Sequence, residues 1–263
     1  MIQYVYNAFC ITGVGIGDWF QRSNTPLIFN AYCPNFKPLF KTCDFLGHDK
    51  ESFADIFGIL VDDRLVGNLE LLEEPQRIEF PYNSKHAWRP QFDSFDCNSI
   101  VNATAVVFTR RPHPLDVHHE FNDKLRLTIS PRFDFTLAPL CGVRVCVHYR
   151  AGDVFHGFDH KPDSRSMSLT TLQSYVKLFS NELARMQTRF VIYVLTELST
   201  VDSIRLTESL EGRTQVLANT KDTKIHLVFA TKCDVLVLGA GSFSWIYALL
   251  NTNALKFIHS GRP

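Results

Sequence analysis

The chain has 263 residues and a mass of 30.1 kDa, which at about 150 residues per domain suggests two domains. Lys and Arg together number 27, as do Asp and Glu, so the formal charge is zero. A protein that binds duplex DNA through its phosphates would carry a basic excess, and we expect no nucleic-acid partner. Apolar residues make up 45%, enough for a packed core, and 22 phenylalanines raise the aromatic fraction to 13%. The composition excludes a disordered or fibrous chain.

The seven cysteines form no short-spaced pair of the kind that binds zinc. Cys141 and Cys146 flank or lie within an apolar run, where cysteine acts as a small hydrophobic residue. No apolar run reaches the ~18 residues needed to cross a bilayer, and no secretory signal is visible. Asn102-Ala103-Thr104 fits a glycosylation sequon, a triplet that is common by chance. These features predict a cytoplasmic protein in a reducing compartment, with no membrane segment in this chain.

The first half of the sequence predicts few regular elements. A strand is expected within Met1–Ile11, followed by a glycine-rich turn and by a helix that begins at Trp19 and ends before Pro26. The stretch Pro34–Phe57 shows no clean hydrophobic periodicity. The stretch Glu73–Pro90 is polar and broken by prolines, which predicts a loop. Short strands or helices are expected at Ile59–Val61 and Leu69–Leu72, a strand at Ile100–Thr109 and a helix at Pro112–Leu127.

The second half predicts a parallel sheet, because apolar strands alternate with amphipathic helices. Ser168 is expected to cap the first helix. Right-handed crossovers place the carboxyl ends of all strands at one edge, where such sheets bind ligands. The strands are expected at Val143–Tyr149, Phe190–Leu195, Thr214–Leu217, Asp234–Leu238 and Leu255–Ile258, and the helices at Ser168–Met186, Thr200–Leu210, Asp222–Thr231 and Phe243–Leu250.

A connector bracketed by Pro131 and Pro139 separates the irregular half from the regular one. We therefore expect a domain junction between Pro131 and Gly142, with one domain at 1–135 and a second at 136–263.

Three expected strand-to-helix junctions carry unusual residues. In the first, Gly13-Val14-Gly15-Ile16-Gly17-Asp18, the glycines allow backbone amides to approach a phosphate or sugar; the alternative is an ordinary tight turn. In the third, Gly239-Ala240-Gly241-Ser242-Phe243-Ser244-Trp245, amides and hydroxyls at a helix start either bind an anion or simply cap the helix.

The second junction is His148-Tyr149-Arg150-Ala151-Gly152-Asp153. Because a strand alternates its faces, His148 and Arg150 point the same way. A cation at the end of an apolar strand needs an anionic partner. Asp153 is either that partner in a structural ion pair, or it orients Arg150 while the guanidinium binds a phosphate. An arginine and a helix start that converge from adjacent loops are what a diphosphate requires.

The same residues carry a resemblance to a known family. His148–Asp153 matches the HxRxGD motif of the fucosyltransferase superfamily, which includes α-1,2-, α-1,6- and O-fucosyltransferases, and Gly241–Trp245 resembles the SSFSWW-like segment of these enzymes. Gly15-Ile16-Gly17-Asp18 is similar to their first glycine loop. The resemblance covers Val143–Asn251. It departs from the family pattern at Ala151, which replaces a common second arginine, and at Ala240-Gly241 and Ile246 in the third junction.

This resemblance implies an α/β protein of GT-B type, with two Rossmann-like parallel-sheet domains facing a cleft. The N-terminal domain would lie on the acceptor side, and the C-terminal domain would bind a GDP-sugar. The implied activity is inverting transfer of a sugar, fucose above all, from a GDP-sugar to a glycan hydroxyl, without metal or other cofactor. Two alternatives stay open: a transferase for another nucleotide sugar, such as GDP-rhamnose or GDP-mannose, and a non-catalytic carbohydrate- or nucleotide-binding relative.

The resemblance also implies roles for individual residues. Arg150 would bind the β-phosphate and neutralise the leaving GDP, and His148 would contact the nucleotide. Asp153, with Gly152, would hold the loop. The diphosphate or the guanosine would contact the segment Gly241, Ser242, Phe243 and Ser244, and Glu197 would lie near the guanosine.

The catalytic base is expected at Asp18, whose carboxylate could accept the proton of the acceptor hydroxyl; the alternative is a helix cap. Asp159 is a weaker candidate. His156 and His160 lie in a stretch that reads as a loop, which argues against a metal site. The histidines His113, His118 and His119 are expected on a surface helix. Trp19 and Trp88 could stack on a sugar, and the alternative for Trp19 is packing in the core.

Overall fold

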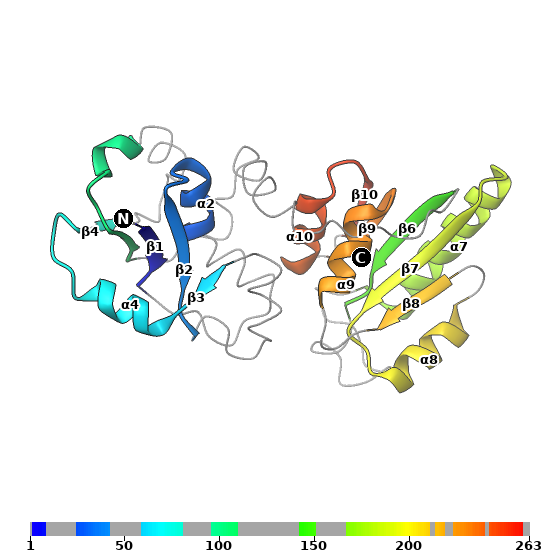
Figure 1. Ribbon diagram of the computed structural model, residues 1–263. Helices are drawn as coiled ribbons and strands as arrows, with labels where there is room; N and C mark the ends of the chain where they lie inside the picture. The colour runs from blue at the N-terminus through cyan, green and yellow to red at the C-terminus, as the bar shows by residue number, and fades with distance from the viewer. Residues whose placement is uncertain are drawn as a thin grey trace. The chain divides into compact units, whose positions relative to one another are not determined.

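The computed structural model describes residues 2–8, 25–42, 59–80, 96–109, 142–150, 167–210, 214–218, 223–239 and 242–259. The chain divides into two compact units, Met1–Arg132 and Phe133–Pro263. Each unit contains a five-stranded sheet whose paired strands all run parallel (Figure 1).

The sheet of the first unit has the strand order β3-β2-β1-β5-β4. Its strands are β1 (Gln3–Asn7), β2 (Phe36–Phe40), β3 (Leu60–Val61), β4 (Arg77–Phe80) and β5 (Ala105–Phe108). The described helices of this unit are α2 (Thr25–Tyr32), α4 (Asp63–Glu70) and the 3-10 helix η2 (Cys97–Ile100). Helix α2 packs on one face of the sheet and α4 on the other, because neighbouring residues of β1 belong to different cores: Val5 packs with Phe29, and Tyr6 with Val66.

Phenylalanines build much of the core beneath α2. The ring of Phe29 meets Phe36 and Phe108 edge-on, with centroids 5.6 and 5.7 Å apart. All three side chains are buried. The high phenylalanine content therefore serves, at these positions, to fill the core of the first unit.

The structure corrects one prediction for the first half and leaves another untested. The helix expected to begin at Trp19 and end before Pro26 falls on residues 19–24, outside the described residues. Helix α2 begins at Thr25, and Pro26 is its second residue, where its missing N–H costs no hydrogen bond. Strand β2 lies in a stretch without hydrophobic periodicity, because Pro38 interrupts its apolar residues. The loop predicted at Glu73–Pro90 is wrong for β4, whose charged residues Arg77 and Glu79 obscure the apolar ones.

Other predictions are confirmed or shifted. The short element expected at Leu69–Leu72 is the end of α4, which begins earlier because Asp62 caps it: the Asp62 side chain accepts a hydrogen bond from the Leu65 N–H at 2.9 Å. Strand β5 lies within the range Ile100–Thr109, and the helix expected at Pro112–Leu127 lies outside the described residues.

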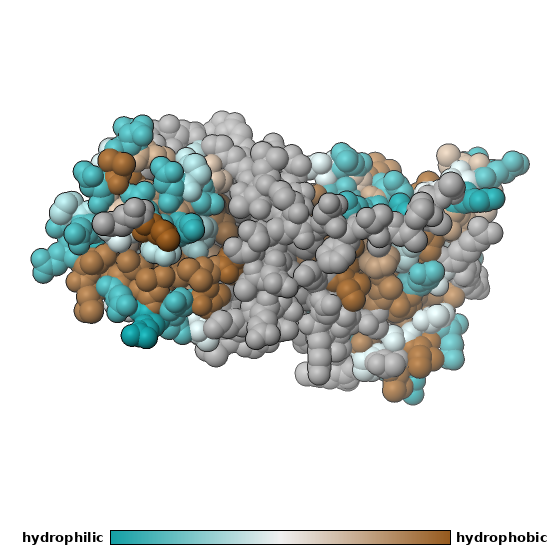
Figure 2. All heavy atoms as spheres, in the orientation of Figure 1, coloured by the Kyte–Doolittle hydropathy of each residue, from teal (hydrophilic) through white to brown (hydrophobic). Residues whose placement is uncertain are grey.

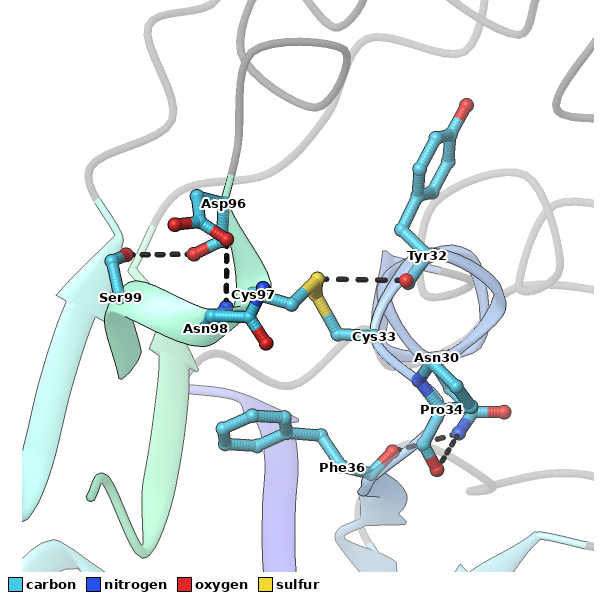
Figure 3. The surroundings of a disulfide bond; sticks show 9 residues. All are labelled: Asn30, Tyr32, Cys33, Pro34, Phe36, Asp96, Cys97, Asn98 and Ser99. Carbon is cyan, nitrogen blue, oxygen red and sulfur yellow. Dashed lines mark hydrogen bonds between the residues drawn. A yellow bond between two sulfur atoms is a disulfide. The ribbon is translucent and has the colours of Figure 1, made fainter. Parts of the chain in front are cut away.

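A disulfide bond joins Cys33, just after α2, to Cys97 at the start of η2 (Figure 3). The two Cα atoms are 5.7 Å apart, although 64 residues separate them in sequence. The prediction of a reducing compartment conflicts with this bond, because disulfides persist in oxidising environments. The spacing of cysteines in the sequence could not reveal this bond, since only the folded sheet brings the two cysteines together.

The sheet of the second unit has the strand order β10-β9-β6-β7-β8. Its strands are β6 (Val143–His148), β7 (Phe190–Thr196), β8 (Thr214–Ala218), β9 (Val235–Leu238) and β10 (Leu255–Ile258), and its described helices are α7 (Leu169–Arg185), α8 (Thr200–Ser209), α9 (Thr223–Lys232) and α10 (Ser242–Leu250). These elements confirm the regular half of the sequence prediction within a few residues. Ser168 caps α7 as expected, its hydroxyl accepting from the Thr171 N–H at 3.1 Å.

Alternation along β6 assigns its side chains to two layers. Val145 and Val147 pack with residues of α7 and α8 in one buried cluster. Cys146 faces the other layer, where its thiol donates to the carbonyl of Phe229 in α9 at 3.5 Å, and His148 contacts Tyr247 of α10. Helices therefore cover both faces of this sheet, as in doubly wound α/β folds (Figure 1).

Large side chains are buried in the described part of each unit, Phe29 in the first and Tyr247 in the second, and apolar residues also appear among hydrophilic ones at the described surface (Figure 2). No helix in the described ranges is long and apolar enough to cross a membrane.

Candidate functional site

The strand order of the second sheet creates a topological switch point between β6 and β9. From β6 the chain adds β7 and β8 on one side, and it then crosses to add β9 and β10 on the other. Parallel sheets bind ligands outside the carboxyl ends of the strands at such a point. Here those ends lead to His148 on β6 and to the start of α10 after β9.

His148 joins the two sides of the switch point. Its Nδ1 lies 2.6 Å from Oγ of Ser244 in α10, a hydrogen bond between residues 96 positions apart. Both side chains are buried, with 5% and 3% of their surface exposed. The imidazole also meets the ring of Tyr247 edge-on, at a centroid distance of 5.0 Å. These contacts fix the end of β6 against the first turn of α10.

The surroundings of His148 keep its imidazole neutral. Burial is the main cause that lowers the pKa of His148 from 6.5 to about 3, and the nearby His226 and Arg150 lower it further. At neutral pH His148 therefore carries no charge, whereas Arg150 supplies a positive charge near this strand end. The half-buried Arg150 follows His148 by two residues, as the strand alternation predicts.

Helix α10 begins at the switch point. Ser242 is its first residue, and the backbone amides of a first helical turn have no partner within the helix. With the helix dipole, such amides favour an anion. Gly241 and the side chains of Ser242 and Phe243 lie outside what the structure describes, whereas Ser244 is described through its bond to His148.

The end of β7 supplies further polar groups to the same edge. Thr196 is 1% exposed, and its hydroxyl has no hydrogen-bond partner among the described residues. Glu197 follows it, and its charge is the second cause, after burial, that raises the pKa of Tyr247. Because Tyr247 contacts His148, Glu197 belongs to the same group of residues. The structure thus brings together four predicted site residues: His148, Arg150, Glu197 and Ser244.

His226 is a residue of this group that sequence reasoning missed. It is buried on α9, and its Nε2 donates a hydrogen bond to the carbonyl of Leu217 in β8 at 2.9 Å. A carbonyl accepts only, so Nε2 carries the proton. The sequence signal was a lone histidine in the apolar run Ile225–Phe229, a pattern more typical of a core position.

The first sheet has its own switch point, between β1 and β5. Two buried polar residues that the sequence did not single out flank residues 8–24: Asn7 ends β1, and Thr25 begins α2 with a hydroxyl that has no hydrogen-bond partner in the described part of the chain. The predicted loop residues Gly15, Gly17 and Asp18 lie between them, outside the described residues.

The other predicted residues also lie outside the described residues. This holds for the loop residues Gly152 and Asp153 and for the further candidates Trp19, Trp88, His113, His118, His119, His156, Asp159 and His160. Among the described residues, no three His, Cys, Asp or Glu side chains gather as metal ligands would. Transfer without a metal stays a prediction.

No family model and no curated protein sequence matches this chain. Solved structures do. POFUT1, a GT-B fucosyltransferase, in complex with GDP matches with a TM-score of 0.51 at 12% identity, over 98% of each chain. POFUT1 with GDP-fucose gives 0.49 at 12% identity, over 98% of this chain and 97% of that one. The E. coli heptosyltransferase WaaC with ADP-2-deoxy-2-fluoro heptose gives 0.47 at 9% identity, over 97% and 88%.

At such identities the similarity shows the fold. The predicted fold class, α/β of GT-B type with two parallel sheets, is confirmed. The neighbours are glycosyltransferases whose structures hold a nucleotide or a nucleotide sugar.

Proposed function

We propose that this chain is an inverting, metal-independent glycosyltransferase that moves a sugar, with fucose preferred, from a GDP-sugar to a glycan hydroxyl. One observation carries the proposal: the His148–Ser244 hydrogen bond joins the end of β6, two residues before Arg150, to the start of α10 at the switch point of the second sheet. A cation beside the N-terminus of a helix suits a diphosphate. The HxRxGD resemblance and the fold shared with the GDP complex of POFUT1 support the same conclusion.

In this proposal the second domain, 136–263, binds the donor. Arg150 binds the β-phosphate, and the amides of α10, with Gly241, Ser242 and Phe243, bind the rest of the diphosphate. Glu197 lies near the guanosine. His148 and Ser244 are buried against each other, so we assign them a positioning role.

The first domain, 1–135, receives the acceptor. Asp18 takes the proton of the acceptor hydroxyl as its oxygen attacks the anomeric carbon, on the face opposite the leaving GDP. Gly15 and Gly17 let the backbone of that loop approach the sugar. As the bond to GDP breaks, Arg150 stabilises the charge on the β-phosphate, while Gly152 and Asp153 hold the Arg150 loop.

Calorimetric titration with GDP in the presence of a chelator tests the donor site. The wild-type chain should bind GDP without a divalent metal. Loss of hydrogen bonds to a charged phosphate costs about 1.5–3 kcal/mol, so Arg150→Ala should weaken binding roughly 10- to 150-fold. Arg144→Ala is the matched control: Arg144 lies on the same face of β6, six residues and about 20 Å from Arg150, and its loss should leave GDP binding unchanged.

Unaltered GDP binding by Arg150→Ala would overturn the donor site. Donor hydrolysis and transfer with GDP-, UDP- and TDP-sugars then test the activity. Turnover of GDP-fucose that resists the chelator supports the proposal, whereas Arg150-dependent turnover of only another sugar nucleotide would contradict the fucose assignment. GDP binding without turnover of any donor would show a binding protein instead of an enzyme.

A further inference from the structure

Two features of the first unit lie at the amino edge of its sheet. The Cys33–Cys97 disulfide is one: Cys33 precedes β2, and Cys97 lies in η2, ahead of β5. Cys33 is 1% exposed and packs in the core with Phe29 and Phe36, so the bond is part of the folded interior (Figure 3). A disulfide of this kind requires an oxidising compartment while the chain folds.

The second feature is the triplet Asn102-Ala103-Thr104. It is the only Asn-x-Ser/Thr sequence in the 263 residues. Asn102 is exposed in the turn between η2 and β5. The side-chain amide of Gln3 holds this turn by donating to the carbonyls of Val101 and Ala103 at 2.8 and 2.7 Å. No hydrogen bond in the described part of the structure holds the Asn102 side chain itself.

We propose that Asn102 carries an N-linked oligosaccharide, added in the oxidising compartment where the Cys33–Cys97 bond forms. In this reaction the Asn102 amide nitrogen bonds to C1 of the first sugar of a lipid-diphosphate-linked oligosaccharide. The bond between C1 and the diphosphate oxygen breaks, the lipid diphosphate leaves, and a base takes the amide proton. The triplet alone does not indicate that the chain enters a compartment where such transfer occurs. The disulfide supplies that evidence.

The hydroxyl that the triplet requires lies on Thr104, which the sheet holds tightly. Its N–H donates to the carbonyl of Gln76 at 2.8 Å, and its carbonyl accepts from the Tyr4 N–H at 2.9 Å. A transferase must reach Asn102 and Thr104 together. Transfer therefore precedes the pairing of this segment with its neighbours, during synthesis of the chain.

Within the first sheet, Asn102 and Asn7 lie at opposite edges. Asn102 precedes β5 and lies by Gln3, the first residue of β1, at the amino edge of a parallel sheet. Asn7 ends β1 at the carboxyl edge of this sheet. The 5 residues of β1, at about 3.3 Å each, separate these edges by about 16 Å. Asn102 therefore lies at the edge opposite the one where parallel sheets bind ligands.

Peptide mapping of the chain purified from the cells that make it tests the proposal. We expect the peptide with Asn102 to carry a sugar mass that an N-glycan amidase removes, leaving an aspartate at position 102. The same digest without reductant should contain the peptides of Cys33 and Cys97 joined. An unmodified Asn102 peptide, or free thiols at both cysteines, would overturn the proposal.

Variants of the full chain, secreted by eukaryotic cells, test the position. Asn102→Gln should abolish the amidase-sensitive gel shift, and Thr104→Ser should retain it. Asn98→Gln is the matched control: Asn98 is equally exposed in η2, but Ser99 and Ile100 follow it and form no acceptor triplet. A shift that persists in Asn102→Gln would contradict the proposal. Measured GDP binding by Asn102→Gln should equal that of the wild type, so this proposal and the proposed activity fail independently.

Discussion

Ser244 links α10 to β6 through the 2.6 Å hydrogen bond between its Oγ and Nδ1 of His148. Ser244→Ala removes this partner of a buried imidazole, and an unsatisfied buried polar group costs about 1–3 kcal/mol. We expect the free energy of unfolding, measured by urea titration, to fall by that amount. Ser180→Ala is the control, because the buried Ser180 hydroxyl bonds to none of the described residues, and its effect should stay within about 0.5 kcal/mol. Equal losses in both variants would show that the bond contributes nothing.

The neutral state of His148 predicts how stability depends on pH. Its pKa is about 3 in the folded chain and 6.5 in the unfolded chain, so between these values the unfolded chain binds the extra proton. The stability from this residue is complete above pH 6.5 and is lost as the pH falls toward 3. Urea titrations from pH 7.5 to 5 should show a loss that approaches about 1.4 kcal/mol per pH unit for this one proton.

The variant His148→Gln should lack this part of the pH dependence. His259→Gln serves as the control, because His259 lies outside the His148 group, at the end of β10. If His148→Gln and the wild type lose stability in parallel down to pH 5, the imidazole is not held neutral.

At the scale of helices and strands, we expect substitution by alanine to have opposite effects at two glycines. Gly67 lies within α4 with open space around it, and Gly67→Ala should stabilise the helix by about 1 kcal/mol. At Gly142 a Cβ would overlap the carbonyl of Arg189, whose oxygen accepts the Val143 N–H at 2.8 Å. Gly142→Ala should therefore push β6 from β7 and destabilise the chain by about 1–3 kcal/mol. Thermal unfolding of the two variants measures both signs, and a stabilised Gly142→Ala would contradict this account of the strand pairing.

The predictability of an element depended on how many signals agreed within it. Strand β6 and helix α7 combine apolar periodicity with a clear end or cap, and both were found near their predicted bounds. Strand β4, by contrast, is an edge strand whose charged residues alternate with Ile78 and Phe80 between prolines. This segment forms a strand because it pairs with β5, whose residues lie about 28 positions away in sequence. Local patterns carry no information about such a partner.

The candidate site was partly predictable for a topological reason. In a parallel sheet the residues after each strand meet at one edge, so His148, Arg150 and Glu197 could be grouped from strand ends. His226 lies within a helix, and only the packing of α9 on β8 brings it to this edge. The disulfide was missed for the same reason, because the sheet sets the distance between its cysteines.

At the scale of the whole molecule, two compact units, each with its own buried clusters, predict two unfolding events. The double variant Cys33→Ser/Cys97→Ser frees a loop of 64 residues, which costs about 4 kcal/mol by chain entropy. Hydrogen exchange should rise in α2 and β5 of the first unit, while α7 and β7 of the second keep their protection. Faster exchange in both units would show that they unfold together.

The Cys33–Cys97 bond also encloses a stretch of chain that contains β2, β3, α4 and β4. A protease that cuts once inside this stretch produces two fragments that remain one covalent molecule until a reductant is added. Such a nicked protein migrates as the intact chain on a non-reducing gel and separates only when its sulfur atoms do.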